Sequence, residues 1–200
     1  MTKNTDTRQL ILDTAATMFH NQSYNTVGVA AICKQANVSK GSFFHFFKSK
    51  QDLALEVLEH FQILISKQLI NKAFLSSISP MQRFDIFINE LFNFQQLQTQ
   101  THGHMPGCPF GNMAMEQSTQ DEVLREKSAA CLDQLASHFQ TALSDAINTG
   151  ALSSLDIEAS ADAMLSYIEG VQLLAKARNS PELILKLGPA MKLIRIENTE

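Results

Sequence analysis

The stretch from Val27 to Leu53 constrains this chain most, because it reads as two short helices joined by a tight turn and followed by the start of a longer helix. Apolar residues recur in the stretch at helical spacing, and short polar or basic residues lie between them. This pattern suits two small helices packed at a steep angle, the second presenting polar side chains outward. It is the helix-turn-helix arrangement, whose second helix enters the major groove of DNA.

The distribution of charge agrees with this interpretation, although the formal net charge of the whole chain is −4. Residues 1–50 carry six basic and two acidic side chains, whereas residues 51–200 carry ten basic and eighteen acidic ones. Only one end of a modular DNA-binding protein must meet phosphates, so a basic N-terminal end on an acidic body is compatible with that role.

Several other classes of protein are disfavoured. No signal peptide is evident and no apolar run approaches the ~18 residues of a membrane span, so we expect a cytoplasmic protein without membrane association. The three cysteines (Cys33, Cys108 and Cys131) form no evident disulfide framework, which fits a reducing compartment. The sequence has no nucleophile–base arrangement, glycine-rich phosphate loop or paired carboxylates, so we expect neither an enzyme nor a bound cofactor.

The rest of the chain predicts an all-α fold of about nine helices. A capping box at Asp6 opens the first helix, Thr26 caps a helix over 27–35, and Ser39 and Ser49 cap the next two. Pro80 and Pro109 stand at helix starts, residues 99–107 form a loop, Asp156 caps a helix to about 178, and Gly188-Pro189 breaks the last helix. We expect a three-helix DNA-binding domain over 1–50 and a helical ligand-binding and dimerisation domain over 51–200.

The N-terminal part resembles the tetracycline-repressor (TetR) family of bacterial regulators. The resemblance rests on A-x-x-x-F at 15–19, T-V-x-V-A-A-I at 26–32, V-S-K-G-S-F-F-H-F-F at 38–47 and K-S-K-Q-D-L at 48–53. It implies a repressor that binds a palindromic operator in double-stranded DNA and is released by a small-molecule inducer. It also implies a homodimer formed through the last two long helices, over about 157–178 and 181–194, which build a four-helix bundle.

Two departures from the family pattern concern the DNA-binding end. Asn37 replaces the usual glycine of the turn, and asparagine tolerates left-handed backbone. Phe44 and Phe46 stand where the family often has tyrosines whose hydroxyls reach DNA phosphates, so we expect DNA binding to be weaker or differently distributed.

Candidate DNA contacts lie on or near the third helix. Thr26 and Lys50 are expected at phosphates, and Gly41 permits close approach of the backbone. Phe43 is open between a DNA contact and the core, whereas Phe46 and Phe47 are assigned to the core. Phe44 is a further candidate, at a position where the family often contacts a phosphate through a tyrosine. The remaining candidates, for contacts with base edges or the thymine methyl group, are Ser39, Lys40, Ser42 and His45.

A ligand pocket is expected in the C-terminal part, with apolar walls and a few polar groups. Its predicted walls are the aromatic helix face between Phe84 and Phe92, together with Phe110, Met113, Phe139 and Tyr167.

Cys108 is the most specific feature of this part of the chain. It falls at the predicted N-cap of a helix, where a thiolate is stabilised, and Lys176 is a possible cationic neighbour. The segment G-C-P-F-G-N resembles a G-C-x-x-G-N subset of the family, some members of which respond to aldehydes, quinones or hypochlorite. The alternative is an inert residue at a helix start, as we expect for Cys33 and Cys131 on apolar faces.

A second hypothesis is a metal-responsive DNA-binding regulator. His102, His104 and Cys108 follow one another as H-x-H-x₃-C and offer nitrogen and sulfur ligands to zinc or another transition metal. Only three ligands are local, whereas a closed structural site needs four, and an ordinary polar loop is the alternative.

Overall fold

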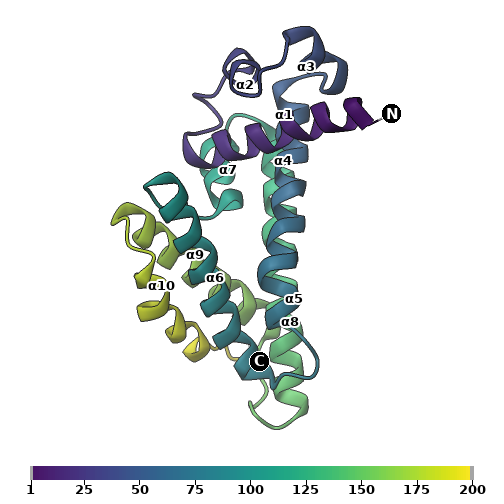
Figure 1. Ribbon diagram of the computed structural model, residues 1–200. Coiled ribbons are helices and arrows are strands. Elements are labelled where there is room, and N and C mark those ends of the chain that lie inside the picture. Colours follow the sequence, from purple (N-terminus) through teal and green to yellow (C-terminus); the bar gives the residue numbers. More distant parts are fainter. Residues whose placement is uncertain (1, 199–200) are drawn as a thin grey trace. The chain divides into compact units, whose positions relative to one another are not determined.

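The computed structural model describes residues 2–198, and every regular element within them is a helix (Figure 1). The all-α prediction is therefore confirmed for this part of the chain. In chain order the elements are α1 (Thr2–Asn21), α2 (Val29–Gln35), α3 (Lys40–Phe46), α4 (Lys50–Ile65), η1 (Ser66–Ile70), α5 (Asn71–Ala73), α6 (Pro80–His102), α7 (Pro109–Gln117), α8 (Glu122–Asn148), α9 (Ile157–Ala177), α10 (Glu182–Leu187) and η2 (Gly188–Leu193).

Two of these helices continue through irregular turns. The π-helical η1 joins α4 to the short α5, and the 3₁₀-helical η2 follows α10 directly at Gly188-Pro189, where a break was predicted. Counting each of these runs as one helix gives nine over the described residues, in agreement with the prediction. None of the helices in this range is long and apolar enough to cross a membrane.

The chain divides into two compact units. The first comprises the residues up to Ile63 together with Pro109–Cys131, and the second comprises Leu64–Cys108 together with the residues from Leu132 onward. The first unit thus includes α7 and the start of α8 in addition to the predicted DNA-binding domain of residues 1–50. The division into compact units does not show which residues bind DNA. The boundary of the DNA-binding domain at residue 50 therefore stays a prediction.

The helix-turn-helix in the first unit follows from local chemistry. Ser39 is the N-cap of α3, where its Oγ accepts a hydrogen bond of 3.0 Å from the Ser42 amide, as predicted. Asn37 adopts φ = 54°, the left-handed conformation expected of the turn. The helix before the turn begins later than predicted, because Gly28 rather than Thr26 is the N-cap of α2.

Contacts with α1 and α4 support these two short helices. α1 begins at Thr2, so Asp6 lies inside the helix and the predicted capping box there is wrong. At the start of α4, Ser49 accepts from the Asp52 amide at 2.9 Å, which confirms the second cap. Arg8 of α1 forms an ion pair with Glu56 of α4 and lies 5.1 Å from the centre of the Phe47 ring.

The second unit is built on α6, α9, α10 and the later part of α8 around an aromatic-rich core. The predicted cap at Asp156 is confirmed by a hydrogen bond of 2.9 Å from the Ala159 amide. α6 includes the first four residues of the predicted loop, ends at His102 and is capped by Gly103, which adopts φ = 80°. The extension is stabilised by helical backbone pairing up to Gly103, which a polar sequence does not prevent. The aromatic core consists of Phe74, Phe84, Phe87 and Phe139, with ring centres 5.2 to 6.0 Å apart.

Candidate functional site

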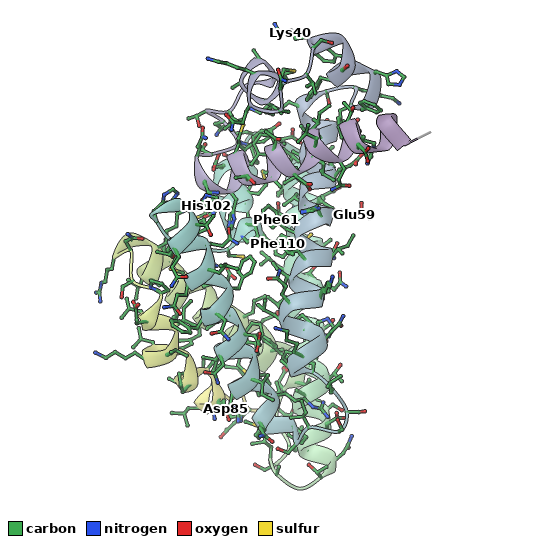
Figure 2. All side chains as sticks on the ribbon, in the orientation of Figure 1. Lys40, Glu59, Phe61, Asp85, His102 and Phe110 are labelled. Atoms are coloured by element: carbon green, nitrogen blue, oxygen red, sulfur yellow. The ribbon has the colours of Figure 1, made fainter. Side chains whose placement is uncertain are left out.

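The outer side of α3 presents the polar residues that the sequence predicts at DNA. Lys40, Gly41 and His45 are exposed and Ser42 is partly exposed; Figure 2 shows Lys40 extending away from the helix. A Cβ added to Gly41 would meet only Ser39 Oγ, at the ordinary contact distance of 3.6 Å. The chain itself would therefore accommodate a side chain at position 41. Because glycine has none, a partner can approach the backbone closely at this position.

The phenylalanines of α3 divide between the two roles that the sequence left open. Phe43 is fully buried, as is Phe47, so of the two roles left open for Phe43 the structure favours the core. Its burial holds α3 in place, because the ring packs against Phe47 at a centre-to-centre distance of 5.9 Å. Phe44, by contrast, exposes 54% of its surface and is available to an external partner.

The two expected phosphate contacts differ in accessibility. Thr26 is exposed, and its hydroxyl donates to the Ser23 carbonyl at 3.3 Å. Lys50 is partly buried, with its Nζ 4.1 Å from the centre of the Tyr24 ring. Burial lowers the pKa of Lys50, and the nearby Glu116 carboxylate partly offsets this effect. Lys50 is therefore less available to a phosphate than an exposed lysine such as Lys40.

The far end of α7 holds the loop that precedes the helix-turn-helix, and both belong to the first unit. Glu116 Oε2 accepts hydrogen bonds from Ser23 Oγ at 2.7 Å and from the Asn25 amide at 3.1 Å. Gln117 Nε2 donates to Asn25 Oδ1 at 2.8 Å. Ser23 adopts φ = 148°, which is unfavourable for a residue with a side chain. These three bonds stabilise that conformation and give Glu116 a role that the sequence did not predict.

Cys108 immediately precedes α7 and is the last residue of this part of the second unit. Its exposed fraction is 8%, and its thiol hydrogen-bonds the Glu169 carboxyl of α9. Lys176, the predicted cationic neighbour, is exposed two turns further along α9. The structure thus identifies an acidic partner for the thiol that the sequence analysis missed.

A buried polar network surrounds this pair. Gln172 Nε2 donates to Glu169 Oε1 at 3.0 Å, and Gln95 Nε2 donates to Gln172 Oε1 at 3.1 Å. Gln95 Nε2 also donates to the carbonyl of Gly107 at 3.0 Å. Burial raises the pKa of Glu169 to about 7, while hydrogen bonds from Cys108 and Gln172 act in the opposite direction.

A signal for this network was present in the sequence. Glu169 lies four residues after the buried Leu165, and Gln172 lies four residues after the buried Ile168. Residues at this spacing share a helix face, so two polar side chains stand within the apolar stripe of α9.

The other residues predicted to line a ligand pocket are distributed over both units. Phe110 and Met113 of α7 are buried in the first unit. In the second unit Phe139 is fully buried in the aromatic core, and Tyr167 donates its hydroxyl to the Leu187 carbonyl at 3.0 Å. A cleft of about 680 Å³ in the second unit has a different lining, formed by residues 76–80, Arg83, Asp145, Asn148, Thr149 and Ala151.

The metal hypothesis is not supported. Among the side chains that the structure describes, no three His, Cys, Asp or Glu residues come together as possible metal ligands. His102 lies at the end of α6 (Figure 2) and His104 is exposed, whereas the Cys108 thiol is buried against Glu169. The alternative hypothesis of a metal site formed by these three residues therefore has no support among the described side chains.

The remaining cysteines are buried. Cys33 exposes 5% and Cys131 exposes 2% of its surface. Burial raises the pKa of the Cys131 thiol, which lowers the thiolate fraction at neutral pH.

Known proteins with similar sequences are bacterial regulators. The family model described as bacterial regulatory proteins, tetR family, matches residues 11–57, and the model described as tetracyclin repressor-like, C-terminal domain, matches residues 80–188. Transcriptional regulator AcuR of Cereibacter sphaeroides is 30% identical over 163 residues, which are 80% of this chain and 72% of that protein. HTH-type transcriptional repressor NemR of Escherichia coli K12 is 26% identical over 152 residues, 75% of this chain and 72% of that protein.

A solved structure has the same fold. The regulatory protein TetR from Rhodobacter sphaeroides superimposes with a TM-score of 0.81 and 25% sequence identity, covering 94% of this chain and 98% of that one.

Proposed function

Since this chain belongs to the TetR family of bacterial transcriptional regulators, we propose that it is a dimeric repressor released from its operator by an electrophile that modifies Cys108. The observation that carries the proposal is the position of this thiol. It stands directly before α7, within a hydrogen-bonded polar network, and the other end of α7 holds the loop that leads into the helix-turn-helix.

The DNA-reading surface in this proposal is the exposed side of α3. The exposure of Lys40 and His45 supports a role for both at base edges, where Lys40 can pair with guanine O6 and N7. Gly41 allows the backbone to approach, and the exposed ring of Phe44 offers apolar contact without the hydroxyl of a tyrosine.

The dimer in this proposal forms through α9 and α10, which correspond to the two helices expected over about 157–178 and 181–194. An exposed stripe of small and apolar residues on α9 supports this, because Gly170, Leu173 and Ala177 recur at helical spacing. Leu173 exposes 52% and the adjacent Leu174 exposes 43% of its surface. Small residues let helices approach closely, and exposed apolar surface of this kind is typical of an interface.

Coupling between the thiol and the DNA-binding module would pass along α7. An adduct on Cys108 cannot occupy the space of a thiol that is 8% exposed, so the start of α7 must shift or the surrounding network must open. A shift of α7 would pull Glu116 from Ser23 and the Asn25 amide, which releases the loop before α2. The electrophile then acts by favouring a conformation with lower affinity for the operator.

The experiment compares operator binding before and after exposure to a thiol-reactive enedione. The operator is first selected by the protein from a random duplex library, and N-methylmaleimide is then the test electrophile. We expect the wild type to lose operator affinity upon modification of Cys108, and Cys108→Ser to keep it. Cys33→Ser serves as the matched control and should respond like the wild type. If treated Cys108→Ser loses operator affinity to the same extent as the wild type, the Cys108 thiol is not the sensor. The alternative is then an inducer that binds reversibly in a pocket.

A further inference from the structure

The side chains around Cys108 form a closed ring rather than a simple pair. The Cys108 thiol meets Glu169, Glu169 meets Gln172, and Gln172 meets Gln95 through hydrogen bonds. Gln95 Nε2 then returns to the carbonyl of Gly107, the residue covalently attached to Cys108. Gln95 and Gln172 expose 1% and 5% of their surfaces, so the ring lies inside the unit.

Burying such a ring is unfavourable unless every polar group is paired, and one group is not. Gln95 Oε1 is buried and has no hydrogen-bond partner. Exchanging the oxygen and nitrogen of this amide does not repair the defect, because Nε2 already donates to two oxygens, those of Gly107 and Gln172. The ring therefore lacks one donor next to the residue that precedes the thiol.

We infer that Glu169 is the base that activates Cys108, and that the site takes an uncharged Michael acceptor carrying a hydrogen-bond donor for Gln95 Oε1. This inference rests on the proposed function, because it concerns the chemistry of the same thiol. Glu169 is placed for the role by its direct hydrogen bond to the thiol, and Gln172 orients the carboxylate by donating to Oε1. A base must be within hydrogen-bond reach of the proton it removes, and Glu169 is.

The groups facing Glu169 define how it can titrate. α6 contributes the neutral amide of Gln95 to the ring, α9 contributes Gln172, and the segment before α7 contributes Cys108. The influences on its ionisation are burial and the hydrogen bonds from Cys108 and Gln172, of which only the thiol is titratable. A carboxylate in this setting accepts a proton near neutral pH, where an exposed glutamate would already be ionised and too weak a base.

The reaction step is an addition without an oxidant or reductant. Glu169 removes the thiol proton while the sulfur attacks one carbon of the C=C bond, so that an S–C bond forms. The π electrons of the alkene move onto the adjacent carbonyl as an enolate. The proton held by Glu169 returns to the other alkene carbon, which completes the thioether and restores the carboxylate.

An anionic electrophile is disfavoured at this site. Proton transfer from Cys108 to Glu169 leaves one negative charge in a poorly solvated ring, and a second one there would be destabilised. A neutral enedione with an N–H group instead supplies the donor that Gln95 Oε1 lacks. Maleimide and N-methylmaleimide form a matched pair, because they share the reacting double bond and differ in that N–H.

The first experiment measures the rate constant for addition of maleimide to Cys108 between pH 5.5 and 8.5, by mass spectrometry on the full-length protein. In the wild type we expect the rate to rise with a midpoint near 7, the pKa of Glu169. In Glu169→Gln we expect the rise to move above pH 8 and the rate at pH 7 to fall about 100-fold, the lower end of what a positioned base contributes. Glu169→Asp keeps a carboxylate and should recover part of the rate with a midpoint below that of Glu169→Gln.

Asp162→Asn, which neutralises an exposed carboxylate on the same helix, is the control and should match the wild type. A profile for Glu169→Gln that coincides with the wild type would show that Glu169 is not the base. If addition to Cys108 follows the expected profile but operator binding is unchanged, the base assignment holds and the proposed electrophile response fails. The two ideas are thus distinguished by separate readouts.

The second experiment tests the ligand class. The rate constants for maleimide and N-methylmaleimide are each divided by those for free glutathione, so that intrinsic reactivity cancels. We expect the wild type to prefer maleimide about tenfold, which corresponds to one hydrogen bond in a buried site. Gln95→Met removes the acceptor with little change in volume and should abolish the preference for maleimide. The variant also removes the donor to Gly107 and Gln172, so it is compared only through the ratio of the two reagents. Equal normalised rates in the wild type would overturn the assignment of Gln95 Oε1 to the ligand.

Discussion

At the scale of single residues, the ionisation of Glu169 links the site to the stability of the protein. Its folded pKa of about 7 lies above the ordinary value of 4.5, because burial disfavours the carboxylate. The folded chain therefore binds more protons than the unfolded chain between these two values. The stabilisation that Glu169 contributes to the folded state is fully present below the unfolded pKa and is lost as the pH rises through about 7.

We expect Glu169→Gln to remove this pH-dependent loss of stability, because glutamine does not titrate. Relative to the variant, the wild type should become less stable by about 3 kcal/mol between pH 4.5 and pH 8, since each pKa unit corresponds to about 1.4 kcal/mol. Urea unfolding at several pH values, with Asp162→Asn as the control, measures the difference. Parallel curves for the wild type and Glu169→Gln would contradict a raised pKa in the folded state.

Asn37 gives a second prediction at this scale, because it holds φ = 54° in the turn between α2 and α3. Left-handed backbone costs most residues about 1–2 kcal/mol, and glycine much less. We expect Asn37→Ala to lower the free energy of unfolding by about 1 kcal/mol. Asn37→Gly, measured in the same urea titration, should be close to the wild type. Equal losses in both variants would assign the role of Asn37 to its side-chain contacts.

At the scale of elements, three side-chain hydrogen bonds connect the end of α7 to the loop over 22–28. Glu116 supplies two of its hydrogen bonds, and Gln117 supplies another. Hydrogen bonds to a charged group each contribute roughly 1.5–3 kcal/mol, less where water competes. The Glu116 side chain therefore contributes to the order of a loop that leads into the helix-turn-helix, together with the buried Tyr24 and Val27.

We expect Glu116→Ala to accelerate amide hydrogen exchange over residues 23–28 and to lower operator affinity. The reason is that Ser23 and the Asn25 amide lose their shared acceptor, and the unfavourable backbone of Ser23 is no longer stabilised. Glu122→Ala, at the exposed first residue of α8, is the control. Unchanged exchange in Glu116→Ala would mean that the loop is held by other contacts.

At the scale of the whole molecule, regulators of this family bind one operator with two subunits. A substitution at one position therefore changes two DNA contacts of the dimer. Lys40 is exposed, whereas Lys50 lies over the Tyr24 ring. Each phosphate charge neutralised contributes about 0.9 to the slope of log affinity against log salt. We expect Lys40→Gln to flatten this slope by up to about 2 per dimer and Lys50→Gln to flatten it less. Fluorescence anisotropy at 50 to 300 mM salt measures both, and the reverse order would show that Lys50 leaves Tyr24 upon binding.

Dimerisation gives the second prediction at this scale. A Cβ added at Gly170 meets nothing within 4 Å, so Gly170→Ala and Gly170→Glu both fit the subunit itself. If the α9 stripe is the interface, a buried glutamate there separates the subunits, whereas alanine is tolerated. We expect Gly170→Glu to elute as a monomer in size-exclusion chromatography with light scattering, and Gly170→Ala to stay dimeric. A dimeric Gly170→Glu would exclude this face.

The sequence alone determined the features that depend on near neighbours. Caps at Ser39, Ser49 and Asp156, the left-handed Asn37 and the break at Gly188 all involve residues a few positions apart, so local chemistry was sufficient to predict them. The helix-turn-helix pattern rests on the same short-range spacing, and the family was indicated by the resemblance of the motifs that contain it. Boundaries failed where a polar sequence continues a helix, as at the start of α1 and the end of α6.

Only the tertiary structure decided how residues far apart in the chain meet. It buried Phe43, kept His102 and His104 from joining Cys108 in a metal site, and paired the thiol with Glu169, 61 residues later. The polar positions within the apolar stripe of α9 were visible in the sequence, but their partners on α6 and before α7 were not. The reason is physical: the ionisation of a carboxyl and the reactivity of a thiol depend on burial and on which groups face them, and these arise only when distant helices pack together.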